Sequence, residues 1–251
     1  MSDILQKLAQ SIVSLFKHHK LKMLLTLVFA LFFFAIRFPY DDLSDLLTSE
    51  VSKRTNVFVQ FDYMGIKIFP RFGVSFDNIS VDAPRTPTLK ATSLAAFPLI
   101  GKFLTFKQGY QLSAEGFFEG DVDINFSQGS KNKEGVRSLD VDLEISQLEM
   151  LKLKDLGLLP INFEGKLDAD TELSMDPSFA QQPQGEIEIR VGELRLPPST
   201  VETAFGPISL PNISWSEVLL KGRLVDSELV IEEANLGTKR DEIYGRLKGK
   251  V

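Results

Sequence analysis

The chain has 251 residues, a net charge of −6 and 43% hydrophobic residues, which is enough apolar material for one large or two small cores. It contains no cysteine, which excludes disulfides, thiolate metal sites and cysteine nucleophiles. The acidic balance argues against nucleic acid as a partner, because no basic field is present to bind phosphates.

Residues 1–20 form a basic lead-in with apolar residues near helical spacing. We expect this segment to be cytoplasmic. It either lies on the inner leaflet of a membrane or is the start of the helix that follows.

Residues 21–38, LKMLLTLVFALFFFAIRF, are the most hydrophobic stretch and are interpreted as a transmembrane anchor helix. The uncharged run, Met23 to Ile36, has only 14 residues, fewer than the roughly 20 that cross a bilayer. Lys20, Lys22 and Arg37 flank it, and such long side chains can reach the headgroups from within the helix. A cleavable signal peptide and a buried helix of a soluble protein are the alternatives, but no small-residue cleavage site follows the run.

The charges before this stretch predict its orientation. Four lysines and one aspartate lie among the first 22 residues, and an excess of positive charge keeps a flanking segment in the cytoplasm. Everything after Pro39 is then exported. An exported region without disulfides suits a bacterial periplasm, so we expect a protein of the bacterial inner membrane with most of its chain in the periplasm.

Residues 39–126 are expected to form an opening periplasmic module. Asp41 to Lys53 reads as a short helix with an acidic start. From Asn56 the hydrophobic period changes to two, which predicts a meander of strands. The clearest alternation runs through Gly116, Phe118, Gly120, Val122, Ile124 and Phe126 and is interpreted as one strand.

Residues 127–251 continue the same alternation of polar and apolar residues. Because the chain stops within the run 243–251, we expect either a C-terminal truncation or a short member of its kind. Alternating runs at 139–145, 163–173, 187–191 and 243–251 predict half-buried antiparallel strands, since buried parallel strands would read as continuous apolar runs. The one helix expected in this half is Ser146 to Leu156. The predicted fold class is therefore mainly β: one transmembrane helix, then an elongated, curved, mostly antiparallel sheet with few short helices.

A sheet with one apolar face must cover that face, and few helices are available to do so. It can fold on itself as a sandwich or barrel, bind a protein partner, or form a trough for lipid chains. Uncovered apolar surface beyond a few hundred Å² usually marks an interaction site.

No pattern of an enzyme is present, so no catalytic, cofactor-binding or metal-binding residue is predicted. The only histidines, His18 and His19, lie in the basic lead-in, and phosphate loops, nucleophile elbows and zinc-binding helices are absent. Three Asp-x-Asp pairs, at 121/123, 140/142 and 168/170, place two carboxylates on one face of a strand. Alternation on a solvated strand face produces such pairs without any metal.

The segment Phe69 to Val81, FPRFGVSFDNISV, resembles the start of AsmA-like periplasmic domains, in which a spanning helix and a short helix lead into strands around a Phe-Pro segment. The order of elements through Phe126, including the segment 99–103, is similar to the opening module of that family. With its modest length and Glu-Gly-led strands, the whole chain most resembles the protein N (GspN) family of the bacterial type II secretion machinery.

This resemblance implies a single-pass inner-membrane accessory component of type II secretion, whose partners are inner-membrane lipids and other secretion subunits. Through its AsmA-like side it implies, as the alternative, a protein that carries phospholipid along a hydrophobic groove between the inner and outer membranes. The candidate groove residues are apolar positions of the alternating runs, each of which can also be ordinary core: Phe118, Val122, Ile124, Phe126, Leu143, Phe163 and Leu167.

Overall fold

The computed structural model describes residues 20–37, 40–55, 57–68, 71–84, 86–103, 107–131, 137–155, 162–177, 182–203, 206–225 and 228–250. The lead-in 1–19, Phe38, Pro39 and the Phe69-Pro70 step of the AsmA-like segment lie outside these ranges. Two compact units are found, Met1–Leu43 and Ser44–Val251.

The first unit contains helix α2 (Lys20–Arg37), and helix α3 (Tyr40–Thr55) begins at its end. The helix expected over 21–38 is therefore present, but the expectation that it is a transmembrane helix is corrected by the structure. Within the described residues, no helix is long and apolar enough to cross a membrane. The physical reason is that Lys20, Lys22 and Arg37 all fall inside the 18 residues of α2, which leaves an apolar run too short for a bilayer.

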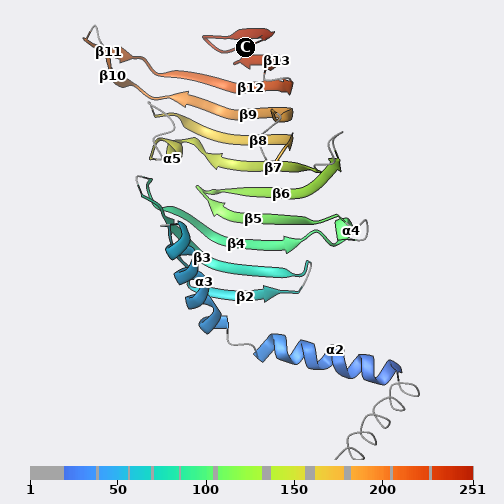
Figure 1. Ribbon diagram of the computed structural model, residues 1–251. Coiled ribbons are helices and arrows are strands. Elements are labelled where there is room, and N and C mark those ends of the chain that lie inside the picture. Colours follow the sequence, from blue (N-terminus) through green and yellow to red (C-terminus); the bar gives the residue numbers. More distant parts are fainter. Residues whose placement is uncertain are drawn as a thin grey trace, which may run out of the picture. The chain divides into compact units, whose positions relative to one another are not determined.

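The second unit is dominated by one antiparallel sheet of twelve strands in nearly sequential order (Figure 1). Its first half contains strands that are joined mostly by short turns, with β1 and β2 both paired to β3: β1 (Phe58–Gln60), β2 (Tyr63–Lys67), β3 (Gly73–Asp82), β4 (Leu89–Pro98), β5 (Gly109–Phe117) and β6 (Gly120–Lys131). The short helix α4 (Ile100–Phe103) lies between β4 and β5. The meander predicted from Asn56 onward is confirmed.

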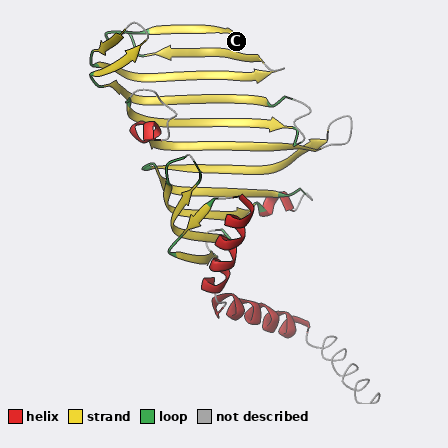
Figure 2. Cartoon of the chain, turned by 60° about the vertical axis from the view of Figure 1, so that its left-hand side comes forward, coloured by secondary structure: helices red, strands yellow, loops and turns green. Residues whose placement is uncertain are grey.

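The second half continues the ladder through β7 (Arg137–Glu149), β8 (Glu164–Met175), β9 (Gln184–Leu196), β12 (Ile213–Val225), β13 (Glu228–Leu236) and β14 (Gly245–Lys250). Helix α5 (Met150–Asp155) follows β7. A separate two-stranded hairpin, β10 (Ser199–Thr203) and β11 (Gly206–Leu210), is inserted between β9 and β12 (Figure 2). β6 runs through residue 126, so both expected β segments belong to one sheet.

Two predicted elements have different bounds. The run 116–126 is not one strand, because β5 ends at Phe117 and β6 starts at Gly120. Phe118 and Glu119 between them have φ of 49° and 65°, as a two-residue type I′ hairpin requires. The helix expected over 146–156 is confined to α5, since Ser146 to Glu149 extend β7. Leu156 lies outside the described residues.

The buried core is small for a chain of this length. No described side chain is fully buried, and the main buried cluster consists of Val191, Leu194, Leu196 and Trp215 on β9 and β12. Met150 of α5, Phe163 and Leu210 of β11 pack against this cluster. The core therefore sits toward one end of these strands, where α5 and the β10–β11 hairpin supply covering side chains.

Candidate functional site

The strand register aligns apolar side chains into rows that cross the whole sheet. Direct cross-strand partners have Cβ atoms about 5 Å apart and share one face. The central row follows such partners through eleven strands without a polar member: Met64, Phe76, Leu94, Ala114, Val122, Ile145, Ala169, Ile189, Leu220, Ala234 and Leu247. The sequence alternation of each strand thus becomes a continuous apolar band.

Two further rows lie on the same face, one beside the central row and the next beyond it. One contains a single polar side chain, Thr171: Ile66, Val74, Ala96, Leu112, Ile124, Leu143, Thr171, Ile187, Gly222, Ile231 and Gly249. The other is shorter: Pro98, Tyr110, Phe126, Val141, Leu173, Gly185, Leu224 and Leu229. We call these three rows the apolar face.

The apolar face is only partly buried. In the central row Met64 is 5% exposed and Leu247 is 59% exposed, and the nine side chains between them have intermediate exposure. The only other sheet in the described ranges is the β10–β11 hairpin, which packs near the core cluster through Leu210. The side chains of the apolar face are therefore partly covered by their neighbours on adjacent strands, and much of their surface remains in contact with solvent.

The opposite face of the central strands is polar and strongly acidic. One row of direct partners contains carboxylates on four successive strands: Asp123, Glu144, Asp170 and Glu188. Toward β12 cations pair with acids of this face: Lys221 Nζ lies 2.9 Å and Arg190 3.0 Å from Glu188, and Arg223 lies 3.2 Å from Glu186. The two faces thus differ sharply in polarity, as in antiparallel sheets that bury one face and solvate the other.

The register brings together five of the seven predicted groove residues. Val122, Ile124, Phe126 and Leu143 lie on adjacent positions of β6 and β7 in the apolar face. Leu167 follows on the same face, opposite Val191 and beside the core cluster.

The other two predicted residues lie elsewhere. Phe118 is in the β5–β6 turn, where its ring centroid is 4.5 Å from that of Phe117. Phe163 precedes β8 and packs against the buried cluster, so its role is core packing. The predicted flanks Lys20, Lys22 and Arg37 lie at the two ends of α2.

The Asp-x-Asp pairs make hydrogen bonds within the sheet. Asp168 Oδ1 accepts from the backbone N–H of Gln147 at 2.8 Å, which satisfies a bulge where Gln147 has a φ of 57°. Asp121 accepts from the backbone N–H of Gly116, and Asp140 accepts from the Ser174 hydroxyl at 2.8 Å. No group of three potential metal ligands occurs among the described residues.

One carboxyl near the β5–β6 turn has a perturbed pKa. The side chain of Glu119 hydrogen-bonds to Glu149, and this contact, together with partial desolvation and the like charge, raises the pKa of Glu149. Lys152, whose Nζ lies 3.6 Å from Glu119, acts in the opposite direction. The pair lies where the turn meets the end of β7, since the Glu149 N–H also donates to the carbonyl of Phe118 at 3.0 Å.

Several members of the apolar face were missed by sequence reasoning. Phe76, Leu94 and Leu220 belong to the central row but were not among the predicted groove residues. The signal that identifies them is parity: once one residue of a strand is placed, every second residue shares its face. The register between strands, which decides which residues join one row, could not be predicted from the pattern within each strand.

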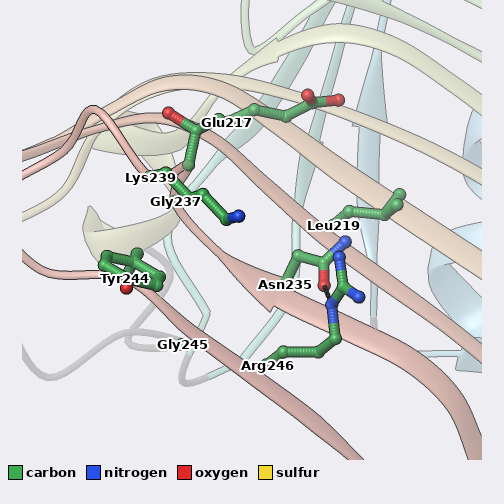
Figure 3. Close-up of a pocket in the computed structure, with 9 residues that line it drawn as sticks. Glu217, Leu219, Asn235, Gly237, Lys239, Tyr244, Gly245 and Arg246 are labelled. Atoms are coloured by element: carbon green, nitrogen blue, oxygen red, sulfur yellow. Dashed lines mark hydrogen bonds between the residues drawn. The ribbon is translucent and has the colours of Figure 1, made fainter.

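Pockets occur on the polar face, and one of them lies at its C-terminal edge (Figure 3). It has a volume of about 460 Å³ and is formed by β12, β13, β14 and the turn between β13 and β14. Comparison with known protein families, curated proteins and solved structures gives no match to this chain.

Proposed function

We propose that the chain is a lipid-binding protein of the bacterial cell envelope, and that phospholipid acyl chains cover its apolar face. The observation that carries this proposal is the central row, in which eleven strands present apolar side chains and nine of these are only partly buried. In this proposal the sheet is the elongated, curved sheet of an AsmA-like protein and carries phospholipid between the inner and outer membranes.

The dimensions of the row suit acyl chains. Ten strand-to-strand steps of about 4.8 Å make it roughly 48 Å long. One leaflet of a bilayer has a hydrocarbon thickness of about 15 Å, half of the bilayer core. The row is thus longer than one extended acyl chain, and each methylene taken from water onto it contributes about 0.8 kcal/mol. A continuous row also offers no polar barrier to movement along the sheet.

Helix α2 supports a location at the inner membrane in this proposal. Its large apolar side chains are exposed in the first unit: Leu24, Leu25, Leu27, Val28, Phe29, Phe32, Phe33 and Phe34 are each 45–65% exposed. Exposed apolar surface of this extent marks an interaction site, and Lys20, Lys22 and Arg37 at its ends suit anionic headgroups. We propose attachment of the helix to inner-membrane lipid, with the sheet in the periplasm.

Lipid extraction from the purified full chain, followed by mass spectrometry, tests the proposal. Leu143→Gln places an amide on the apolar face, and Glu144→Gln places the same side chain on the opposite face of the same strand. The expected result is stoichiometric phospholipid on the wild type and on the Glu144→Gln control, with several-fold less on Leu143→Gln. Lipid-free wild-type protein, or equal lipid on both variants, contradicts it.

A second candidate is an accessory component of the type II secretion machinery, with protein subunits covering the same face. The observation that favours it is the resemblance of the whole chain, in its modest length and Glu-Gly-led strands, to the protein N family. The two candidates differ in what lies against Ile124 and Leu143: acyl chains in the first and side chains of another protein in the second.

A further inference from the structure

The pocket at the C-terminal edge of the polar face has a different character from the rest of that face. Leu219, Asn235 and Arg246 are successive direct partners on β12, β13 and β14 and form its floor. Residues 237–239 and Tyr244 form its wall. Its volume of about 460 Å³ lies within the range of roughly 300–1,000 Å³ that small-molecule sites occupy.

Two cations enter this pocket without acidic partners. Arg246 Nε donates to Asn235 Oδ1 at 2.9 Å, which holds the guanidinium and leaves its two terminal nitrogens available. Lys239 extends into the pocket from the turn (Figure 3). Among the described residues no carboxylate pairs with either of them. This contrasts with Lys221, Arg223 and Lys250 on the same face, each of which forms an ion pair.

The single acidic residue of the lining is already neutralised. Glu217 Oε1 lies 3.2 Å from Arg190 Nε, and in Figure 3 its carboxylate points away from Lys239 and Arg246. The pocket therefore has a local excess of positive charge, on a face that carries an acidic row from Asp123 to Glu188. Such a charge reversal favours an anion and disfavours a cation.

The turn that carries Lys239 is held in place by several contacts. Asp241 Oδ2 accepts from the backbone N–H of Thr238 at 2.6 Å and from the Ser216 hydroxyl at 2.8 Å. Gly237 donates its N–H to the Glu217 carbonyl at 2.9 Å, and its φ of 70° places its backbone against Trp215. The turn is thus tied to β12 and to the core, so the pocket is largely preformed.

We propose that this pocket binds a phosphate group attached to a small organic moiety. The guanidinium of Arg246 matches two phosphate oxygens, and the ammonium of Lys239 adds a point charge. Tyr244 and Leu219 supply apolar surface for the organic part. The phosphate belongs either to a soluble monoester or to a phospholipid headgroup that reaches over the edge strand β14. This site is separate from the apolar face.

Calorimetric titration of the full chain in detergent with glycerol 3-phosphate tests the site. Arg246→Gln and Lys239→Gln are each expected to weaken binding by roughly tenfold or more, since each removes a charge-assisted contact. Lys248→Gln and Arg240→Gln are matched controls that remove neighbouring charges outside the pocket and are expected to have little effect. Equal weakening by variants and controls would overturn the site, because it would show general electrostatic attraction.

A second titration distinguishes the two sources of phosphate. Vesicles of phosphatidylglycerol and phosphatidylcholine are added to the same variants. Binding of vesicles but not of glycerol 3-phosphate, with the same dependence on Arg246 and Lys239, assigns the site to a headgroup. Binding of neither probe overturns the proposal. Leu143→Gln, which tests the apolar face, is expected to leave binding of glycerol 3-phosphate unchanged. Failure of one proposal would therefore leave the other standing.

Discussion

Ile124 of β6 lies directly opposite Leu143 of β7, and both side chains belong to the apolar face. Both are only partly buried, so the sheet gains limited stability from them. We predict that Leu143→Gln lowers the free energy of unfolding by about 1 kcal/mol or less, within the range of substitutions outside a closed core. Urea unfolding followed by circular dichroism checks this. A loss above 3 kcal/mol would show that the face is a packed core.

The opposite prediction holds for Trp215, which is 9% exposed and lies opposite Leu194 in the buried cluster. Trp215→Ala is expected to lower the free energy of unfolding by about 3–5 kcal/mol, because it leaves a cavity among β9, β12, α5 and β11. Ile208→Ala on β11 is the control, since Ile208 is 50% exposed. It should change stability by about 0.5 kcal/mol or less. Similar losses in the two variants would contradict the location of the core.

Substitution of Gly116 tests the backbone conformation of the bulge before the β5–β6 turn. Its φ is 68°, and an added Cβ would lie 2.3 Å from Thr92 Oγ1. Gly116→Ala is therefore expected to destabilise the fold by at least about 1–2 kcal/mol, the cost of the left-handed conformation alone. Gly101→Ala is the control, because nothing lies within 4 Å of its added Cβ. A neutral effect of Gly116→Ala in thermal unfolding would refute this backbone conformation.

The raised pKa of Glu149 predicts that the stability of the fold depends on pH. Its pKa is raised above 4.5, first by the hydrogen bond with Glu119, so the folded chain holds this proton more tightly than the unfolded chain. Stability from this group is present below the ordinary pKa and is lost as the pH rises through the raised pKa. Glu149→Gln should flatten the curve of melting temperature against pH in this window, and Glu119→Gln should do the same. Unchanged curves in both variants would show that the pair is not coupled.

The sequence predicted the strands well where alternation is regular, as in 139–145 and 163–173, because polar and apolar residues exchange at every step. It failed at Phe118 and Glu119, because the two-residue hairpin reverses the parity of the alternation and the extra residue at the Gly116 bulge restores it. Ala114 and Val122 therefore share a face with the parity of an uninterrupted strand, and the turn is hidden. It also failed at Ser146 to Glu149, where the bulge at Gln147 interrupts the period and β7 continues to Glu149.

The candidate site was predictable only in part, for a related reason. Alternation identifies the apolar side of each strand, so Val122, Ile124 and Leu143 were found. Which residues of distant strands join them depends on register, which turn geometry and bulges set. The local sequence pattern could not predict that Phe163 packs in the core. The cluster that it packs against contains the Leu194–Trp215 pair, which is formed by strands later in the chain.

Photo-crosslinking in living bacterial cells tests the central claim most directly, since it identifies what covers the apolar face. A photoreactive phenylalanine derivative replaces Ile124 on the apolar face or, as control, Asn125 on the polar face of the same strand. The proposal predicts phospholipid adducts at position 124 and none at position 125. Protein adducts alone at position 124, or lipid adducts equal at both positions, would contradict it.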